Sequence, residues 1–146
     1  IHKGSPLDIT RHHRKTKSNG GTWKKKNISY VYRYKHRAWH RLFDDLPSLE
    51  MFSQFLLYLS IFGSIYPESN SQKRIIREWV SKNRAGARKY QAWKELFGGL
   101  NLEGIVNEIN SIYIDPDYQI AVELVLIKRK VRVVEKSIRI KRVTVN

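Results

Sequence analysis

The spacing of hydrophobic residues changes along the chain, and in its first forty or so residues it predicts a β-hairpin followed by a helix. Residues 9–14 predict a short strand, and residues 27–34 are rich in β-branched and aromatic side chains, which is typical of the returning strand. Between them lies the sequence Lys-Ser-Asn-Gly-Gly at 17–21, and glycine adopts the positive φ that a sharp loop needs. A helix is expected to begin between Tyr34 and His36. The predicted order of elements is strand, loop, strand, helix.

This expected helix carries an apolar surface next to its histidines. Trp39, Leu42 and Phe43 follow at the three- and four-residue spacing of one helix side. Stacking of Trp39 on a nucleobase is an alternative. Core packing is favoured because Leu42 and Phe43 continue the same apolar surface.

The most hydrophobic stretch, residues 46–66, predicts a helix that is buried or that binds a partner. Ser48 is its expected N-cap. The inward face is expected to contain Met51, Phe52, Phe55, Leu56 and Leu59. Polar and small residues interrupt the run before it reaches the roughly 18–20 apolar residues of a membrane span, so no span is expected. Residues 67–72, Pro-Glu-Ser-Asn-Ser-Gln, predict a linker.

The chain resembles itself at an offset of 54 residues: 35–46 matches 89–100 in Lys, Ala, Trp, Leu, Phe and Leu. A weaker likeness joins 49–55 to 102–109 if one residue is deleted. Either a helical portion was duplicated, which we favour, or one amphipathic pattern was used twice. The second copy has Tyr90 and Lys94 where the first has histidines, and these side chains are not ordinary metal ligands at neutral pH.

The C-terminal part, from Tyr118 onward, has stretches of alternating Val and Ile that predict a β-hairpin or a long edge strand. Residues 128–142 contain eight Lys and Arg against one acidic residue, Glu135. Charge on an edge strand protects against aggregation. The excess of eight basic residues over one acidic residue is larger than such protection needs, and it favours a phosphate-binding arm instead.

Composition limits the size and the partners of the protein. Its 146 residues, 41% of them hydrophobic, suffice for one modest domain with extensions or two very small domains. A net charge of +15 and a pI near 10.2 predict a polyanionic partner, with nucleic acid first and an anionic membrane surface a distant second. The absence of cysteine excludes disulfides and thiol catalysis and is compatible with a reducing compartment. The first residues lack the apolar region of a signal peptide, so an intracellular location, cytoplasmic or organellar, is expected.

Four of the five histidines lie between residues 11 and 43 and suggest a metal site. His36 and His40 are one helical turn apart and share a helix face. His12 is the natural third ligand, and three imidazoles leave one position open for water or a phosphate oxygen. Neighbours on a strand point to opposite sides, so His13 stays free to act as a base. The alternative, histidines scattered on a solvated basic face, explains this paired spacing less well.

The segment HHRKTKSNGG…N…YKHRAWH resembles the HNH (ββα-metal, His-Me finger) endonucleases, and most of all the nuclease domain of the DNase colicins. The resemblance covers about 35 of the 146 residues. It implies that His13 is the general base and that Asn27 braces the loop that holds it. It also implies that a divalent metal ion, such as zinc, magnesium, manganese or nickel, is bound by His12, His36 and His40. The chain lacks the CxxC pairs of many HNH domains, so packing must hold its fold.

The expected fold class is therefore α+β, with an HNH-like ββα module followed by helices and a basic β-hairpin or arm. We expect five parts: an extended lead-in at 1–10, the module with its hydrophobic helix at 11–66, the linker at 67–72, a helical region with the degenerate repeat at 73–113, and a basic β arm at 114–146.

Basic residues crowd the candidate site, as contacts to a phosphate backbone require. The expected nucleic-acid-binding residues are Arg11, Arg14, Lys15, Lys17, Lys24, Lys25, Lys26, Lys35, Arg37, Lys128, Arg129, Lys130 and Arg132. Of these, Arg14 or Lys15 is expected to add electrostatic stabilisation at the reacting phosphate.

The expected function is an HNH-type endonuclease that hydrolyses DNA or RNA with the help of a metal ion. One alternative is a non-catalytic, HNH-derived RNA-binding protein, such as a component of a ribosome or another RNA–protein assembly. A secreted toxin domain is a weaker alternative. The enzyme is favoured because a structural metal site needs its ligands but does not need His13.

Overall fold

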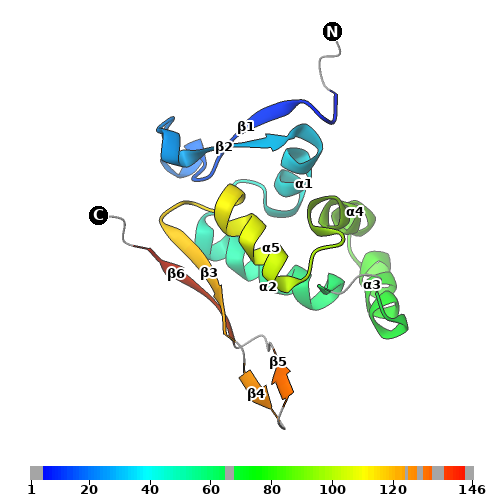
Figure 1. The fold of residues 1–146 in the computed structure, drawn as a ribbon. Coiled ribbons are helices and arrows are strands. Elements are labelled where there is room, and N and C mark those ends of the chain that lie inside the picture. The colour runs from blue at the N-terminus through cyan, green and yellow to red at the C-terminus, as the bar shows by residue number, and fades with distance from the viewer. Residues whose placement is uncertain (1–4, 65–67, 124, 128–129, 133–136, 144–146) are drawn as a thin grey trace.

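The described chain begins with a β-hairpin that lies against the first helix (Figure 1). The computed structural model describes residues 5–64, 68–123, 125–127, 130–132 and 137–143, which form an α+β fold. Strand β1 (Ile9–His13) pairs antiparallel with β2 (Ile28–Tyr32), and α1 (Arg33–Phe43) follows directly. The predicted order of strand, loop, strand and helix is confirmed.

The loop of this hairpin contains two short 3₁₀ turns, Lys17–Asn19 and Lys25–Asn27, and depends on its glycines. Gly20 has a φ of 90°, which favours glycine. A Cβ on Gly21 would lie 1.7 Å from the carbonyl oxygen of Lys15. The loop therefore folds back on its own start at a distance that only glycine permits.

Four further helices build the core beneath the hairpin. They are α2 (Ser48–Phe62), α3 (Asn70–Lys82), α4 (Gly86–Phe97) and α5 (Leu102–Glu108). Helix α5 continues into a π-helical turn, Ile109–Tyr113, here called the π-turn. Helix α1 packs against α4, and α3 packs against both α2 and α4.

The two copies of the repeated helix, α1 and α4, pack directly against each other. Their shared residues occupy equivalent buried positions: Ala38 and Ala92, Trp39 and Trp93, Leu42 and Leu96, Phe43 and Phe97. The predicted core role of Trp39 is confirmed, since its side chain is 4% exposed and stacks on Tyr113.

The likeness continues into the next helix of each copy. Helices α2 and α5 begin at Ser48 and Leu102, again 54 residues apart, and the buried pairs Met51/Ile105 and Phe55/Ile109 keep that offset. The deletion that residue identity suggested is not needed, because burial is shared at positions where identity is lost.

Two predicted helix starts need correction. Ser48 is the first residue of α2 rather than its N-cap, which is Pro47, and no side chain of the described residues caps this end. The predicted linker is shorter than expected, because residues 70–72 form the first turn of α3. The hydroxyl of Ser69 accepts a hydrogen bond from the Gln72 N–H there and starts the helix early. In the part of the chain that the structure describes, no helix has the length and apolar character needed to cross a membrane.

The C-terminal strands pair in two antiparallel sheets. Strand β3 (Tyr118–Val122) pairs with β6 (Ile138–Arg142), and β4 (Val125–Ile127) pairs with β5 (Lys130–Arg132). The β3–β6 pair is part of the core, since Ile120 and Ile138 are buried. The basic residues Lys128 and Arg129 lie outside the described residues.

Candidate functional site

Three histidines from two elements converge beneath the hairpin. His12 comes from β1, and His36 and His40 come from successive turns of α1. One ring nitrogen of each lies within 4.8 Å of the others. Around a tetrahedral ion with bonds of roughly 2.0–2.1 Å, such nitrogens stand about 3.3 Å apart. Small ring movements therefore suffice to close this histidine cluster (His12, His36, His40) on one ion.

Hydrogen bonds orient the ring of His12. Its Nε2–H donates to the carbonyl oxygen of Tyr113 at 2.9 Å, which leaves Nδ1 unprotonated. This Nδ1 is buried and has no hydrogen-bond partner among the described residues. Buried polar atoms are rarely left without a partner. An orphaned lone pair beside two further imidazoles is the environment that a metal ion would complete.

The two helix histidines are oriented in the same manner. The hydroxyl of Thr10 donates its hydrogen to the Val31 carbonyl, so it accepts the second bond, 2.8 Å long, from Nδ1–H of His36. Nδ1 of His40 lies 3.3 Å from the carbonyl oxygen of Asp44 and 3.8 Å from a carboxylate oxygen of Asp45. Among the described residues, Nε2 of neither ring has a hydrogen-bond partner, so both are available to an ion. Oxygen partners that fix a ring in this way are typical of metal-binding histidines.

Two of the three histidines, His12 and His36, are also held in the neutral form that a metal ion requires. Burial, together with the nearby His36, His40 and Arg14, lowers the pKa of His12 from 6.5 to about 3, although the Tyr113 hydrogen bond raises it. Burial and the neighbouring His40 and His13 lower the pKa of His36 to about 4. At neutral pH both rings therefore keep a lone pair available for coordination.

His13 points to the other side of β1 from His12, as strand alternation predicts. It is half-buried, and its ring meets the exposed indole of Trp23 edge-on at a centroid distance of 4.2 Å. Its Nε2 is buried and has no hydrogen-bond partner among the described residues. Burial and the cations Lys17 and Arg11 lower its pKa, so the ring is neutral and able to accept a proton at neutral pH.

Asn27 fastens the two ends of the hairpin loop together. Its Oδ1 accepts from the Lys15 N–H at 2.7 Å, and its Nδ2 donates to the carbonyl oxygens of Lys15 and Thr22 at 3.0 and 2.8 Å. Its own carbonyl accepts from the N–H of Arg14 at 2.8 Å. The side chain is buried, so these bonds fix the backbone directly after His13.

The histidine cluster depends on a segment about a hundred residues away. Carbonyls of the π-turn and of Ile114 directly after it receive hydrogen bonds from hairpin side chains: Ser29 donates to Ile112, and Arg14 donates to Asn110 and Ile114. Together with the His12–Tyr113 bond, these contacts satisfy carbonyls that a helix end leaves free. Tyr113 and Thr10 were not expected at the site. No local spacing in the sequence indicates a backbone carbonyl as the partner of His12.

The predicted nucleic-acid-binding residues fall into different environments. Arg14 is half-buried, and its guanidinium donates hydrogen bonds to the carbonyl oxygens of Asn110 and Ile114. Lys24, Lys25, Lys26 and Arg37 are exposed, and Lys35 is partly exposed. Arg11 and Lys17 are exposed and lie against the indole of Trp23. Lys130 and Arg132 lie on β5, and the structure does not describe their side chains.

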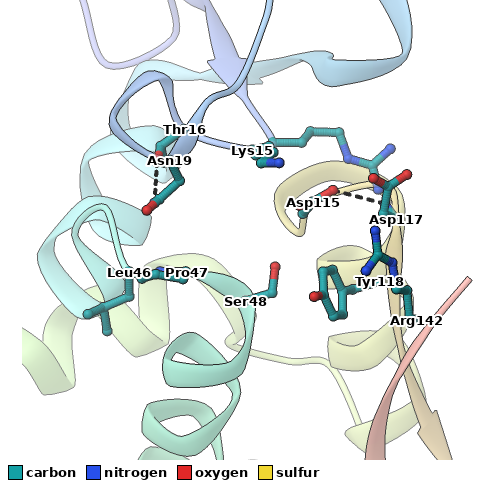
Figure 2. A pocket seen from close by; sticks show the side chains of 11 residues that line it. Lys15, Thr16, Asn19, Leu46, Pro47, Ser48, Asp115, Asp117, Tyr118 and Arg142 are labelled. Atoms are coloured by element: carbon teal, nitrogen blue, oxygen red, sulfur yellow. Dashed lines mark hydrogen bonds between the residues drawn. The ribbon is translucent and has the colours of Figure 1, made fainter.

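Lys15 lines a pocket of about 320 Å³ between the hairpin loop, the start of α2 and the beginning of β3 (Figure 2). Lys15, Arg14 and Arg142 share this pocket with the carboxylates of Asp115 and Asp117. The histidine cluster does not line it. Its charges offset one another, so it lacks the uniform positive charge of a phosphate site.

In the second copy of the repeat, Tyr90 and Lys94 replace the two helix histidines and contact each other. The ammonium of Lys94 lies 4.4 Å from the centre of the Tyr90 ring, and the Tyr90 hydroxyl donates to Glu68 at 2.5 Å. This position of α4 is thus filled by a cation–π pair.

Comparisons of the chain with protein-family models, with curated proteins and with solved structures find no match.

Proposed function

We propose that the protein is a metal-dependent nuclease of the HNH type, which hydrolyses phosphodiester bonds of nucleic acid. One observation carries the proposal: one ring nitrogen from each of three histidines lies within 4.8 Å of the others, and His13 directly follows one of the three, His12, in β1. The charge of +15 supports a polyanionic substrate.

His12, His36 and His40 would hold the ion, which supplies a Lewis acid for the phosphoryl oxygens and the leaving oxygen. The chain's own residues perform the proton transfer. Neutral His13 accepts the proton of the attacking water as the new bond to phosphorus forms and the bond between phosphorus and the leaving oxygen breaks. The resulting imidazolium stands near Arg11 and Lys17, so it releases the proton readily and returns to the neutral form.

Positioning is the role of Asn27 and of the π-turn. Asn27 fixes the backbone after His13 and so sets where the base points. The Tyr113 carbonyl holds His12 in the tautomer that presents Nδ1. Neither group needs to touch the substrate. Removing either one is expected to lower the rate through the residue that it holds.

The test compares the wild-type protein with His13→Ala on plasmid DNA and on a structured RNA. Each protein is assayed with zinc, magnesium, manganese or nickel, and again after addition of a chelator. We expect cleavage that depends on the metal and is lost in His13→Ala, while metal binding measured by calorimetry persists. Arg41→Ala, which removes an exposed charge of α1, is the control and should retain cleavage.

Wild-type protein that binds metal and RNA but cleaves neither nucleic acid would refute the enzyme and favour the non-catalytic RNA-binding alternative. Cleavage that survives in His13→Ala at the wild-type rate would refute the assignment of the base.

A further inference from the structure

Trp23 is an exposed aromatic residue, and packing in the core does not explain its presence in the hairpin loop. Its side chain is 55% exposed, whereas Trp39 and Trp93 are 4% and 5% exposed in the helical core. It lies on the hairpin loop between Gly21 and the three consecutive lysines. An exposed large aromatic side chain within a basic loop suggests a binding surface.

The immediate neighbours of Trp23 belong to the candidate active site. His13 meets the indole at 4.2 Å, while the Lys17 ammonium and the Arg11 guanidinium lie 4.6 and 5.3 Å from the ring centre. Both cations sit on long flexible side chains. A flat ligand that stacks on the indole can displace them, and they can then pair with its flanking negative charges.

The aromatic surface continues along the exposed face of the hairpin. The antiparallel register places Tyr30 opposite Arg11, and Tyr32 opposite Ile9. Tyr30 is 68% exposed and Tyr32 is 45% exposed. Strand alternation places both tyrosines on the same face as His13 and opposite to the buried His12. This aromatic face (Trp23, Tyr30, Tyr32) therefore combines exposed rings, cations and the proposed base.

We propose that the aromatic face binds single-stranded nucleic acid, with an unpaired base stacked on Trp23 beside the phosphodiester that His13 serves. The inference rests on the proposed function for that last point. Aromatic stacking with a positive groove is how proteins hold single strands, since every base offers a π face. In a duplex those faces are covered by neighbouring base pairs, so an exposed indole at this place selects unpaired nucleotides.

The test measures binding of a labelled single-stranded decanucleotide and of the corresponding duplex by fluorescence anisotropy. The full chain is used in EDTA, so that metal-dependent cleavage does not occur. We expect the wild type to favour the single strand and Trp23→Ala to weaken single-strand binding roughly tenfold, which corresponds to about 1.4 kcal/mol. Trp23→Phe keeps an aromatic face and should stay within about threefold of wild type.

A matched charge variant separates stacking from general attraction. Lys24→Ala removes one exposed cation next to Trp23 and should weaken single-strand and duplex binding by the same factor. Intrinsic fluorescence gives a second readout. The single strand should quench tryptophan emission in the wild type, and this quenching should disappear in Trp23→Phe although binding persists.

Equal binding of duplex and single strand by the wild type, or an unchanged single-strand affinity in Trp23→Ala, would overturn the proposal. The proposed nuclease function is tested separately by cleavage. If the protein binds single strands through Trp23 but cleaves nucleic acid with none of the metals, the proposed nuclease function is refuted. The proposed role of the aromatic face is then still supported. Cleavage of a single-stranded substrate that is as fast in Trp23→Ala as in the wild type, with unchanged single-strand affinity, overturns the role of the aromatic face and leaves the nuclease supported.

Discussion

Asn27→Ala tests how the loop holds the proposed base. The substitution removes three side-chain hydrogen bonds to backbone groups, at 2.7, 2.8 and 3.0 Å, from a buried position. At about 0.5–1.5 kcal/mol for each bond, the free energy of unfolding should fall by about 3 kcal/mol. For a chain of this size that corresponds to a decrease in Tm of about 10 °C.

Urea denaturation followed by circular dichroism measures the change. Asn83→Ala is the matched control, because the Asn83 side chain makes one exposed hydrogen bond, to the Trp79 carbonyl. We expect the control to lose less than about 0.5 kcal/mol. Metal affinity of Asn27→Ala should stay close to wild type where the protein is folded, since the Asn27 side chain is hydrogen-bonded to backbone groups of Lys15 and Thr22. If Asn27→Ala is no less stable than Asn83→Ala, Asn27 does not brace the loop.

Three further outcomes are expected. Gly21→Ala should lower the free energy of unfolding by more than about 2 kcal/mol, because its Cβ would lie 1.7 Å from the Lys15 carbonyl oxygen. Urea denaturation measures this change, and a variant that unfolds at the same urea concentration as the wild type would contradict this loop geometry. Stoichiometric zinc should raise the Tm, and His40→Ala should abolish most of that rise in a thermal shift assay, whereas an equal rise in both proteins would place the ion elsewhere. The folded-state pKa of His12 is lowered from 6.5 to about 3, so protonation favours the unfolded chain, and stability is complete above pH 6.5 and falls as the pH drops towards 3. Between pH 7 and 5 the metal-free protein should lose about 2 kcal/mol through this group, and an equally steep loss in His12→Gln would show that His12 is not responsible.

Local spacing predicted the parts of the site that lie within one element or its neighbour. The one-turn separation of His36 and His40 indicated a shared helix face, and strand alternation placed His12 and His13 on opposite sides. Both follow from backbone periods that act over a few residues. The buried role of Trp39 was likewise predictable, because its apolar neighbours recur at helical spacing.

The contacts that join distant segments were not predictable in this way. Tyr113 contributes a backbone carbonyl to His12, and a carbonyl is present at every residue, so its sequence position carries no signal. Arg14 was expected to contact phosphate, and its burial against the π-turn depends on tertiary packing. The start of α2 at Ser48, after Pro47 rather than after a capping serine, also depends on its surroundings.

We propose that His13 removes a proton from the attacking water beside a metal ion held by His12, His36 and His40. Single-turnover cleavage of a labelled oligonucleotide tests it most directly, with wild type and His13→Ala compared at equal metal occupancy. The predicted result is that the cleavage rate falls at least about a hundredfold in His13→Ala, because general base catalysis contributes on the order of 10²–10⁴. Equal single-turnover rates at equal metal occupancy would contradict the claim.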